Sequence, residues 1–155
     1  MKQQIQVPCK VAMSARGASL IATRSIKRGE IVISLRNLQP QRLRTYQTIQ
    51  VRDNHHVVED LLAKLNHSCD PTVFVDTSAG LCVATRDIEV GEELNFFYPS
   101  TETEMAEPFQ CKCQAPNCIK YVKGALDLPL HLLLGRPLAP HVTMALTAKY
   151  IKYTA

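Results

Sequence analysis

The stretch NHSCDP at residues 66–71 decides how this chain folds, because it places polar side chains and a cysteine directly after residues 60–65, whose apolar spacing is that of a helical turn. A second stretch, GEELNFFY at residues 91–98, adds two glutamates and three aromatic residues. Taken alone, Asn66-His67-Ser68 could cap a helical turn and Tyr98 could be a core aromatic residue. Their order along the chain, with a cysteine cluster behind them, favours a functional site instead.

The cysteine cluster is CKCQAPNC at residues 111–118, in which Pro116 and Asn117 favour a tight turn. A loop of this length can fold three thiolates around one metal ion, and tetrahedral zinc then needs a fourth ligand. The candidates for that ligand are the remaining cysteines, Cys9, Cys69 and Cys82. Three free thiols are the alternative interpretation, and the tight spacing favours zinc over it.

The chain has 155 residues, of which 46% are hydrophobic and 21% charged, as expected for one compact domain with a sizeable core. No apolar run approaches the ~20 residues that cross a bilayer, and residues 1–9 lack the apolar segment of a secretory signal. Six cysteines without such a signal indicate a reducing compartment. We expect a soluble, intracellular protein, in the cytoplasm or the nucleus, with no membrane partner.

Charge is distributed unevenly around a net value of +4. Residues 10–52 carry nine basic residues and one acidic residue, whereas residues 91–110 carry five glutamates and no Lys or Arg. The two segments would attract an anionic and a cationic partner, but solvated faces also produce such runs, and that plainer interpretation is favoured for both. A zinc-dependent nucleic-acid binder ranks last, because the basic segment lacks interleaved aromatic residues that stack on bases.

Turn residues between short β-rich runs predict a mainly β fold with short helices. The predicted hairpins pair residues 19–23 with 30–35, 46–51 with 56–58, and 72–76 with 81–85, and residues 93–98 form a further strand. The apolar spacing of residues 60–65 predicts one or two helical turns that end at Asn66.

The C-terminal part of the chain is predicted to be helical. Cap and stop signals indicate one helical turn at residues 101–104 before Pro108, a short helix at 127–134 before Gly135, and a final helix at 140–152. Apolar side chains are dense in residues 126–152, so these helices should pack on the β domain or form a homodimer through the same residues.

In this order, the motifs resemble those of the SET-domain family of protein lysine methyltransferases, from Arg16 to about Gly124. Residues 66–71 are similar to the family's NHSCxP motif, and residues 91–98 are similar to its GEEL-x-F-x-Y motif. Cys111, Cys113 and Cys118 resemble its post-SET zinc cluster, for which Cys69 would supply the fourth thiolate. The chain also resembles the compact, stand-alone members that carry YPSTE, here residues 98–102, before that cluster.

The resemblance implies a SET-domain β-fold in which the chain passes under a loop beside Asn66 as a pseudoknot. It divides the chain into an N-terminal segment at 1–15, a SET domain at 16–100, a post-SET zinc-binding segment at 101–124 and a C-terminal helical extension at 125–155. S-adenosylmethionine would bind on one face, and the substrate lysine would enter from the other face through a narrow channel.

The resemblance also implies the roles of single residues. The predicted cofactor-binding residues are Arg16, Gly17, Ala18, Ser19, Asn66, His67 and Tyr98. Ser19 departs from the family, which usually has a second glycine at this place. Tyr98 would be the catalytic residue that orients the amine and the methyl group, and Phe96, at the family's product-specificity position, would favour di- or trimethylation.

The expected function is therefore S-adenosylmethionine-dependent methyl transfer to the side-chain amine of lysine in a histone or another basic protein, with zinc as a structural ion. The alternative is a catalytically inactive SET-like scaffold that binds a partner through its leucine-rich tail, which the Ser19 departure supports. Retention of Tyr98, Phe96 and the Asn66-His67 pair favours the enzyme. The expected partner is a lysine-bearing protein such as a histone tail, and direct nucleic-acid binding is not expected.

Overall fold

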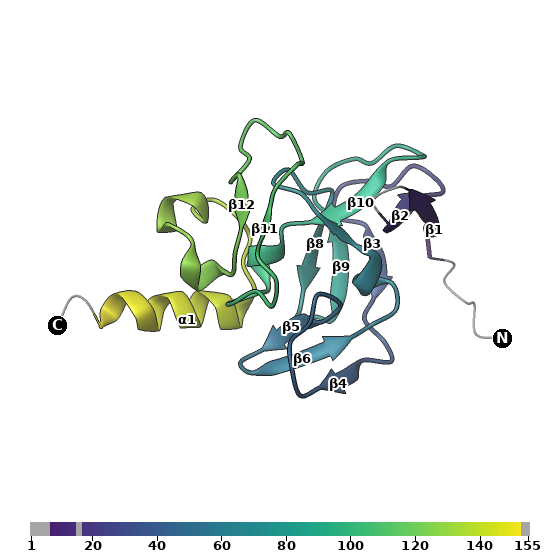
Figure 1. Cartoon of the computed structure of the whole chain (residues 1–155). Helices are drawn as coiled ribbons and strands as arrows, with labels where there is room; N and C mark the ends of the chain where they lie inside the picture. Colours follow the sequence, from purple (N-terminus) through teal and green to yellow (C-terminus); the bar gives the residue numbers. More distant parts are fainter. Residues whose placement is uncertain (1–6, 15–16, 153–155) are drawn as a thin grey trace.

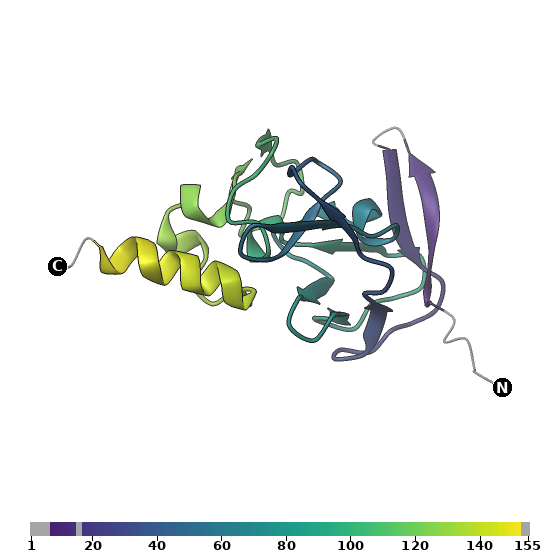
Figure 2. The same ribbon diagram turned by 90° about the horizontal axis from the view of Figure 1, so that it is seen from below.

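The computed structural model describes residues 7–14 and 17–152. Figure 1 shows two parts side by side: the β-sheets, and a smaller part that consists of β11, β12, short turns and α1. The view from below in Figure 2 keeps the same separation, with α1 and the green turns at one end and the β1–β2 hairpin at the other. The segment around Tyr98 connects the two parts.

The central sheet brings the decisive stretches together. Its strands follow the order β1 (Cys9–Ser14), β2 (Gly17–Ala22), β10 (Glu93–Phe96) and β7 (Asn66–His67). β1, β2 and β10 are antiparallel neighbours, whereas β7 runs parallel to β10. The mainly β prediction is confirmed, and the parallel pair places the NHSCDP stretch against the GEELNFFY stretch.

Two three-stranded sheets flank the central sheet. One has the order β3 (Ile31–Ser34), β9 (Leu81–Ala84) and β8 (Val73–Asp76), and the other has the order β4 (Gln39–Gln41), β6 (His55–Val58) and β5 (Ile49–Arg52). The β5–β6 and β8–β9 hairpins are confirmed. Their turns contain Asn54 and Gly80 with φ of 51° and 66°, the left-handed conformation that these residue types tolerate.

The predicted hairpin between residues 19–23 and 30–35 is wrong. β2 pairs with β1 and β10, whereas β3 pairs with β9. The Arg28-Gly29 turn does reverse the chain, but Gly29 donates to the Ala84 carbonyl at 2.8 Å, and Ile26 forms a β-bridge with Ile88. The turn therefore directs the chain to partners far away in sequence. β1 was missed because its Val11 and Met13 are exposed and give no core pattern.

The remaining elements are short, apart from one helix. They are the strands β11 (Phe109–Gln110) and β12 (Tyr121–Val122), the 3-10 turns η1 (Leu62–Lys64), η2 (Tyr98–Ser100), η3 (Ala125–Asp127) and η4 (Leu130–Leu132), and the helix α1 (Pro140–Ile151). The helical turn before Asn66 and the final helix are confirmed as η1 and α1.

Two helical predictions are wrong. Residues 101–104 are not helical, because the backbone there pairs with other segments: Ala125 donates to the Glu102 carbonyl at 2.8 Å and Leu126 to the Thr103 carbonyl at 3.0 Å. The helix expected at 127–134 is divided into η3 and η4, because Pro129 holds the residue before it in an extended conformation.

The side chains form two hydrophobic cores. The sheet core consists of residues between Leu20 and Phe96, whereas the second core consists of Cys69, Phe97 and residues from Ile119 to Leu146. Tyr98 packs against both. Many of the apolar C-terminal residues thus pack on their own chain, whereas Leu134, Met144 and Ile151 are exposed. The homodimer stays a prediction. No helix in the described part of the chain has the length and apolar character needed to cross a bilayer.

Candidate active site

The parallel strands β7 and β10 form the floor of the candidate site. Asn66 lies opposite Asn95 and His67 opposite Phe96, and the Ser68 N–H donates to the Phe96 carbonyl at 3.0 Å. A two-residue strand has little stability of its own. Its place is therefore fixed by contacts with the residues around it.

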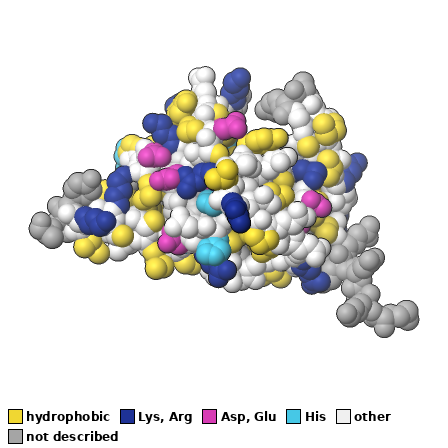
Figure 3. Space-filling model, turned by 60° about the horizontal axis from the view of Figure 1, so that its bottom comes forward, with side chains coloured by type: hydrophobic (Ala, Val, Ile, Leu, Met, Phe, Trp, Pro, Cys, Tyr) yellow, Lys and Arg dark blue, Asp and Glu magenta, His cyan; other side chains and the backbone are white. Residues whose placement is uncertain are grey.

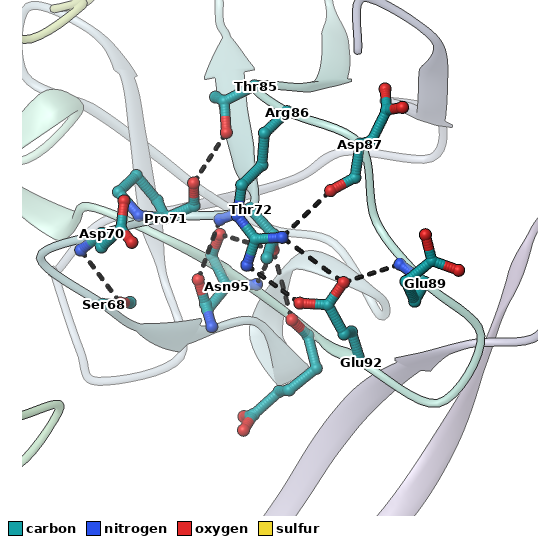
Figure 4. A network of polar contacts seen from close by, with 11 residues as sticks. Ser68, Asp70, Pro71, Thr72, Thr85, Arg86, Asp87, Glu89, Glu92 and Asn95 are labelled. Carbon is teal, nitrogen blue, oxygen red and sulfur yellow. Dashed lines mark hydrogen bonds and ion pairs between the residues drawn. The ribbon is translucent and has the colours of Figure 1, made fainter. Parts of the chain in front are cut away.

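Thr72 provides such a contact, as Figure 4 shows. Its N–H donates to Asn95 Oδ1 at 3.0 Å, and its Oγ1 accepts the Asn95 N–H at 2.9 Å. Thr85 Oγ1 donates to the Pro71 carbonyl at 2.7 Å. Because Thr72 is only 2% exposed, these bonds are shielded from water and hold the end of the NHSCDP stretch on β10.

Tyr98 is held at both its backbone and its hydroxyl. Its N–H donates to His67 Nδ1 at 3.2 Å, and its Oη donates to the Leu65 carbonyl at 2.8 Å. Burial, with the charges of Glu102 and Glu93, raises the pKa of Tyr98 to about 12. The phenol is therefore neutral at physiological pH, so it can orient a substrate by hydrogen bonding but is a poor proton acceptor.

Aromatic rings surround the phenol. The ring centroid of Phe96 lies 4.7 Å from that of Tyr98, that of His67 lies 5.2 Å away, and that of Phe109 lies 6.1 Å away. Phe109 was missed in the sequence because it belongs to the two-residue strand β11, just before the cysteine cluster. These rings provide an apolar wall with few groups that compete for hydrogen bonds.

A cavity of about 990 Å³ opens beside these rings, near the upper limit for small-molecule sites. Asn66, His67, Phe96 and Tyr98 all line it. Other lining residues come from segments far apart in the chain. Glu93 and Glu102 belong to the quoted motifs, whereas Tyr46, Met105 and Phe109 carry no signal in the sequence.

Of the predicted cofactor-binding residues, Gly17, Ala18 and Ser19 lie beside the cavity and do not line it. Gly17, Ala18 and Ser19 belong to β2, and Arg16 lies outside the described residues. The Ala18 carbonyl accepts a hydrogen bond from Asn66 Nδ2 at 3.4 Å, which brings β2 next to the site. Asn66 Nδ2 also donates to Glu93 Oε1 at 2.7 Å, so the amide hydrogens are used internally and Oδ1 is the atom that Asn66 can offer to a ligand.

The four predicted metal ligands converge. The Sγ atoms of Cys69, Cys111, Cys113 and Cys118 all lie within 4.8 Å of one another, and those of Cys69 and Cys111 are 3.8 Å apart. Zn–S bonds of about 2.3 Å give a tetrahedron with edges of about 3.8 Å, so the cluster has the size of a four-thiolate zinc site. Cys9 and Cys82 do not belong to the cluster.

Hydrogen-bond donors point at the cluster. The Ile119 N–H donates to Cys69 Sγ and the Lys120 N–H to Cys118 Sγ, both at 3.4 Å. His67 Nε2 lies 3.4 Å from Cys69 Sγ, and since Nδ1 accepts the Tyr98 N–H, the ring proton belongs on Nε2. Burial lowers the pKa of His67 to about 4, which keeps the ring neutral. The donor set suits thiolates, and four thiolates this close need a cation between them.

A short hairpin holds three of these cysteines. β11 and β12 pair in antiparallel fashion, and the Cys111 N–H donates to the Lys120 carbonyl at 2.7 Å. Gln114 and Lys120 have φ of 59° and 66°, which fits the tight turns of the loop. The hairpin links the cluster directly to Phe109 and so to the wall of the cavity.

The acidic stretch of residues 91–110 does not form one acidic face. Glu92 pairs with Arg86 at 2.9 Å (Figure 4), Glu104 pairs with Arg44, and Glu102 is buried. On the face in Figure 3, Lys and Arg side chains are interspersed with Asp and Glu. The plainer interpretation fits the paired Glu92 and Glu104, whereas Glu93, Glu102 and Glu107 line the cavity.

Comparison with known proteins relates this geometry to a family. The profile of the SET domain matches residues 17–99, the region that carries β2, β7, β10 and Tyr98. The chain belongs to the SET-domain family.

A relative of similar size supports the assignment over most of the chain. The "Methyltransferase flvH" of Aspergillus flavus is 34% identical over 140 residues, which cover 88% of this chain and 76% of the relative. The "Histone-lysine N-methyltransferase, H3 lysine-36 specific" of Candida albicans is 37% identical over 82 residues, which cover 48% of this chain but only 10% of that enzyme. This SET domain is therefore related to methyltransferases, including histone-lysine methyltransferases.

Solved structures show the same fold. KRYPTONITE in complex with mCHG DNA and SAH matches with a TM-score of 0.58 and 19% identity, over 75% of this chain and 29% of that one. KRYPTONITE with mCHH DNA, an H3(1-15) peptide and SAH matches with a TM-score of 0.55 and 20% identity. At this identity, the likeness concerns the fold alone, and it confirms the predicted SET fold.

Proposed function

We propose that this SET domain transfers the methyl group of S-adenosylmethionine to the side-chain amine of lysine in a protein substrate. The observation that carries the proposal is the position of Tyr98, a neutral phenol among aromatic rings on the wall of a cavity of about 990 Å³. The methyltransferase relatives supply the reaction class.

The residues of the cavity fit the cofactor. Asn66 offers an acceptor oxygen, and Glu93 beside it contributes a carboxylate, which together suit the ammonium group of the cofactor's amino-acid part. We assign Gly17, Ala18 and Ser19 to the same site through the Ala18 carbonyl, which lies next to Asn66. When bound, the cofactor supplies an activated methyl group on a sulfonium, so the protein needs to align a nucleophile with it and to exclude water.

The remaining obstacle is the proton on the lysine. Lowering the pKa of the amine from about 10.4 to about 7 takes near 5 kcal/mol, at ~1.36 kcal/mol per pKa unit. Desolvation among Phe96, Phe109 and Tyr98 works in this direction, as does a neighbouring positive charge. Because the phenol is neutral, Tyr98 orients the amine through its Oη and does not take up the proton.

Phe96 sets the number of methyl groups in this proposal. Its ring lies against Tyr98, and phenylalanine leaves more room and one hydrogen-bonding group fewer than tyrosine. We expect di- or trimethyl-lysine from the native chain and a shift toward monomethyl-lysine in F96Y. Mass spectrometry of products formed with excess cofactor checks this, and a native product that stops at one methyl group contradicts it.

Zinc has a structural role in the proposal. Cys69, Cys111, Cys113 and Cys118 match a closed tetrahedral site, which leaves no position for a reactive water. The ion would fasten the hairpin of β11 and β12 to the NHSCDP stretch. Phe109 and Tyr98 would thereby be held on the same cavity.

A histone or another basic protein is the proposed substrate. H3 lysine-36-specific enzymes from several fungi are among the relatives of this chain. A histone substrate would place the reaction in the nucleus.

The test is methyl transfer by the purified, zinc-loaded chain. It is incubated with labelled S-adenosylmethionine and a panel of histones, ribosomal proteins and lysate, with Y98F as the matched control. Label on lysine, located by mass spectrometry and lost in Y98F, is the expected result. Cofactor binding without transfer to any protein in the panel would favour the inactive scaffold instead.

A further inference from the structure

Arg136 lies outside the matched SET domain, yet its half-buried side chain contacts the NHSCDP stretch and the cysteine loop. Nη1 donates to the Cys69 carbonyl at 2.7 Å, Nη2 to the Asn117 carbonyl at 3.3 Å, and Nε to the Leu132 carbonyl at 3.0 Å. One guanidinium therefore joins the NHSCDP stretch, the cysteine loop and η4, three segments that are far apart in the sequence.

The flat face of the same guanidinium covers Phe97. Its Cζ lies 4.1 Å from the centroid of the Phe97 ring, a cation–π contact with a residue that is 3% exposed. Phe97 directly precedes Tyr98, and its ring also lies 5.6 Å from that of His67. Arg136 thus fixes the side chain next to the proposed catalytic residue.

The backbone presents Arg136 in a defined position. Gly135 has φ of 75°, a left-handed conformation that a side chain would strain, and the Arg136 N–H donates to the Leu133 carbonyl at 3.2 Å. Leu133 is 2% exposed and belongs to the second core. The turn is therefore anchored, and the guanidinium is preorganised for its three carbonyl partners.

Residues that come before and after Arg136 in the chain both pack against the segment that follows Tyr98. Gly124 packs so closely that an added Cβ would lie 2.2 Å from Glu104 Cα. After the arginine, the Ala139 N–H donates to the Ser100 carbonyl at 2.8 Å. The C-terminal residues therefore follow the segment after Tyr98 along its length.

Charge adds a second reason for an arginine here. A zinc ion with four thiolates has a net charge of −2, and a guanidinium bound to the Cys69 carbonyl partly compensates it. Lysine would not replace it, because an ammonium is a point charge that cannot donate to three divergent carbonyls and stack on a ring.

We propose that Arg136 is a positioning residue of the active site: it ties the cysteine loop and the NHSCDP stretch together and holds Phe97, so that Tyr98 and His67 keep their places on the cavity. The inference rests on the proposed function for its catalytic consequence. Its consequence for the metal site does not depend on any methyl transfer.

The first test is zinc release from the zinc-loaded chain of 155 residues into a chelating dye. We compare R136A and R136K with R28M, which changes an exposed arginine in the turn before β3. Loss of outer partners typically weakens metal sites about 10–100-fold, so we expect release to be at least about 10-fold faster in R136A and intermediate in R136K. The R28M variant should release zinc at the native rate.

Chemical rescue separates positioning from general stability. Ethylguanidinium should slow zinc release from R136A and restore its affinity for S-adenosylhomocysteine, whereas ethylammonium at equal ionic strength should do neither. If R136A does not fold, the rate of zinc release and the affinity for S-adenosylhomocysteine are measured on R136K instead.

The outcomes are distinct. The inference would be overturned if R136A released zinc at the native rate and bound S-adenosylhomocysteine with native affinity. The same holds for R136K where R136A does not fold. Equal rescue by ethylammonium would also overturn it. If the native chain transfers no methyl group but R136A still loses zinc faster and is rescued, the proposed function fails and the positioning role at the metal site stands.

Discussion

The sheet core and the second core are built in different ways. The sheet core is held by strand ladders, in which β1–β2, β3–β9–β8 and β4–β6–β5 pair over three to six residues. The second core has one pair of two-residue strands, two 3-10 turns and α1. Its segments are joined by single backbone hydrogen bonds and by side chains, namely the cysteine cluster and Arg136.

This difference indicates which structural changes should disturb the site most. Backbone ladders hold most of the sheet core, apart from the two-residue strand β7, whereas the second core depends on a few specific contacts. Tyr98 packs against both cores, and the cavity takes its lining from both. The site should therefore fail when the second core is disturbed, even where the sheets persist.

The largest effect is expected from G124A, which should break the second core alone. The new Cβ would lie 2.2 Å from Glu104 Cα and 2.4 Å from the Thr103 carbonyl oxygen, so backbone must move. We expect a loss of about 3 kcal/mol or more in the free energy of unfolding, measured by urea denaturation. The affinity for zinc should fall as well.

The control for it is G29A. Gly29 has φ of 83° but no atom within 4 Å of the added Cβ, so only conformational strain of about 1–2 kcal/mol is expected. A G124A protein that is as stable as the native chain would show that the close approach to Glu104 does not exist.

The second effect concerns the junction of the two cores. Y98F removes the hydroxyl that donates to the Leu65 carbonyl and leaves the ring in both cores. We expect kcat to fall about 100-fold through lost orientation, with a loss of only about 1 kcal/mol in stability. Y150F, on α1 and away from the cavity, should keep native kinetics. A Y98F variant with more than half of the native kcat would remove Tyr98 from the mechanism.

The third prediction concerns the hydrogen bonds between β5 and the segment after Tyr98. Glu102 Oε1 accepts the Gln50 N–H at 2.7 Å, and Gln50 Oε1 accepts the Thr103 N–H at 3.0 Å. Burial raises the pKa of the Glu102 carboxyl group from 4.5 to about 7, although the hydrogen bonds from Gln50 and Thr101 oppose it. The folded state therefore binds this proton more tightly than the unfolded state.

The contribution of Glu102 to the free energy of unfolding should thus be fully present below pH 4.5. It should decline as the pH rises to about 7, by an amount on the order of 2 kcal/mol. Burial lowers the pKa of His56 and of His141, which makes their contribution run in the opposite direction. The measurement is therefore the difference between E102Q and the native chain in urea midpoints from pH 5 to 8. A difference that does not vary with pH would contradict a buried, titrating Glu102.

The smallest effect belongs to the sheet side of the cavity. E93Q keeps an acceptor for Asn66 Nδ2 but removes the charge. We expect the KM for S-adenosylmethionine to rise about 3–10-fold, with little change in the KM for the protein substrate. E89Q, on the exposed turn before β10, is the matched control. An equal rise in both KM values would place Glu93 outside the cofactor site.

The sequence was informative where local signals agree with the fold. The Asp53-Asn54 and Gly80 turns predicted their hairpins, and the two decisive stretches with the cysteine spacing indicated the SET fold. A turn signal, however, indicates only that the chain reverses its direction. It did not show that β3 would pair with β9, since that choice depends on segments about fifty residues away.

The site was predictable only in part for the same reason. Asn66, His67 and Tyr98 stand in motifs, whereas Phe109 and Arg136 gain their roles from contacts that no local pattern contains. The expected helical turn at residues 101–104 failed because tertiary hydrogen bonds to Gln50 and to residues 125–126 outweighed a weak capping signal.

Removal and return of zinc tests the central claim most directly, with methyl transfer to a responsive protein substrate and far-ultraviolet circular dichroism measured in the same samples. We predict one zinc per chain, loss of transfer when the ion is chelated while the β signal is retained, and recovery of transfer when zinc is restored. Transfer that continues unchanged in the metal-free chain would contradict the dependence of the cavity on the second core.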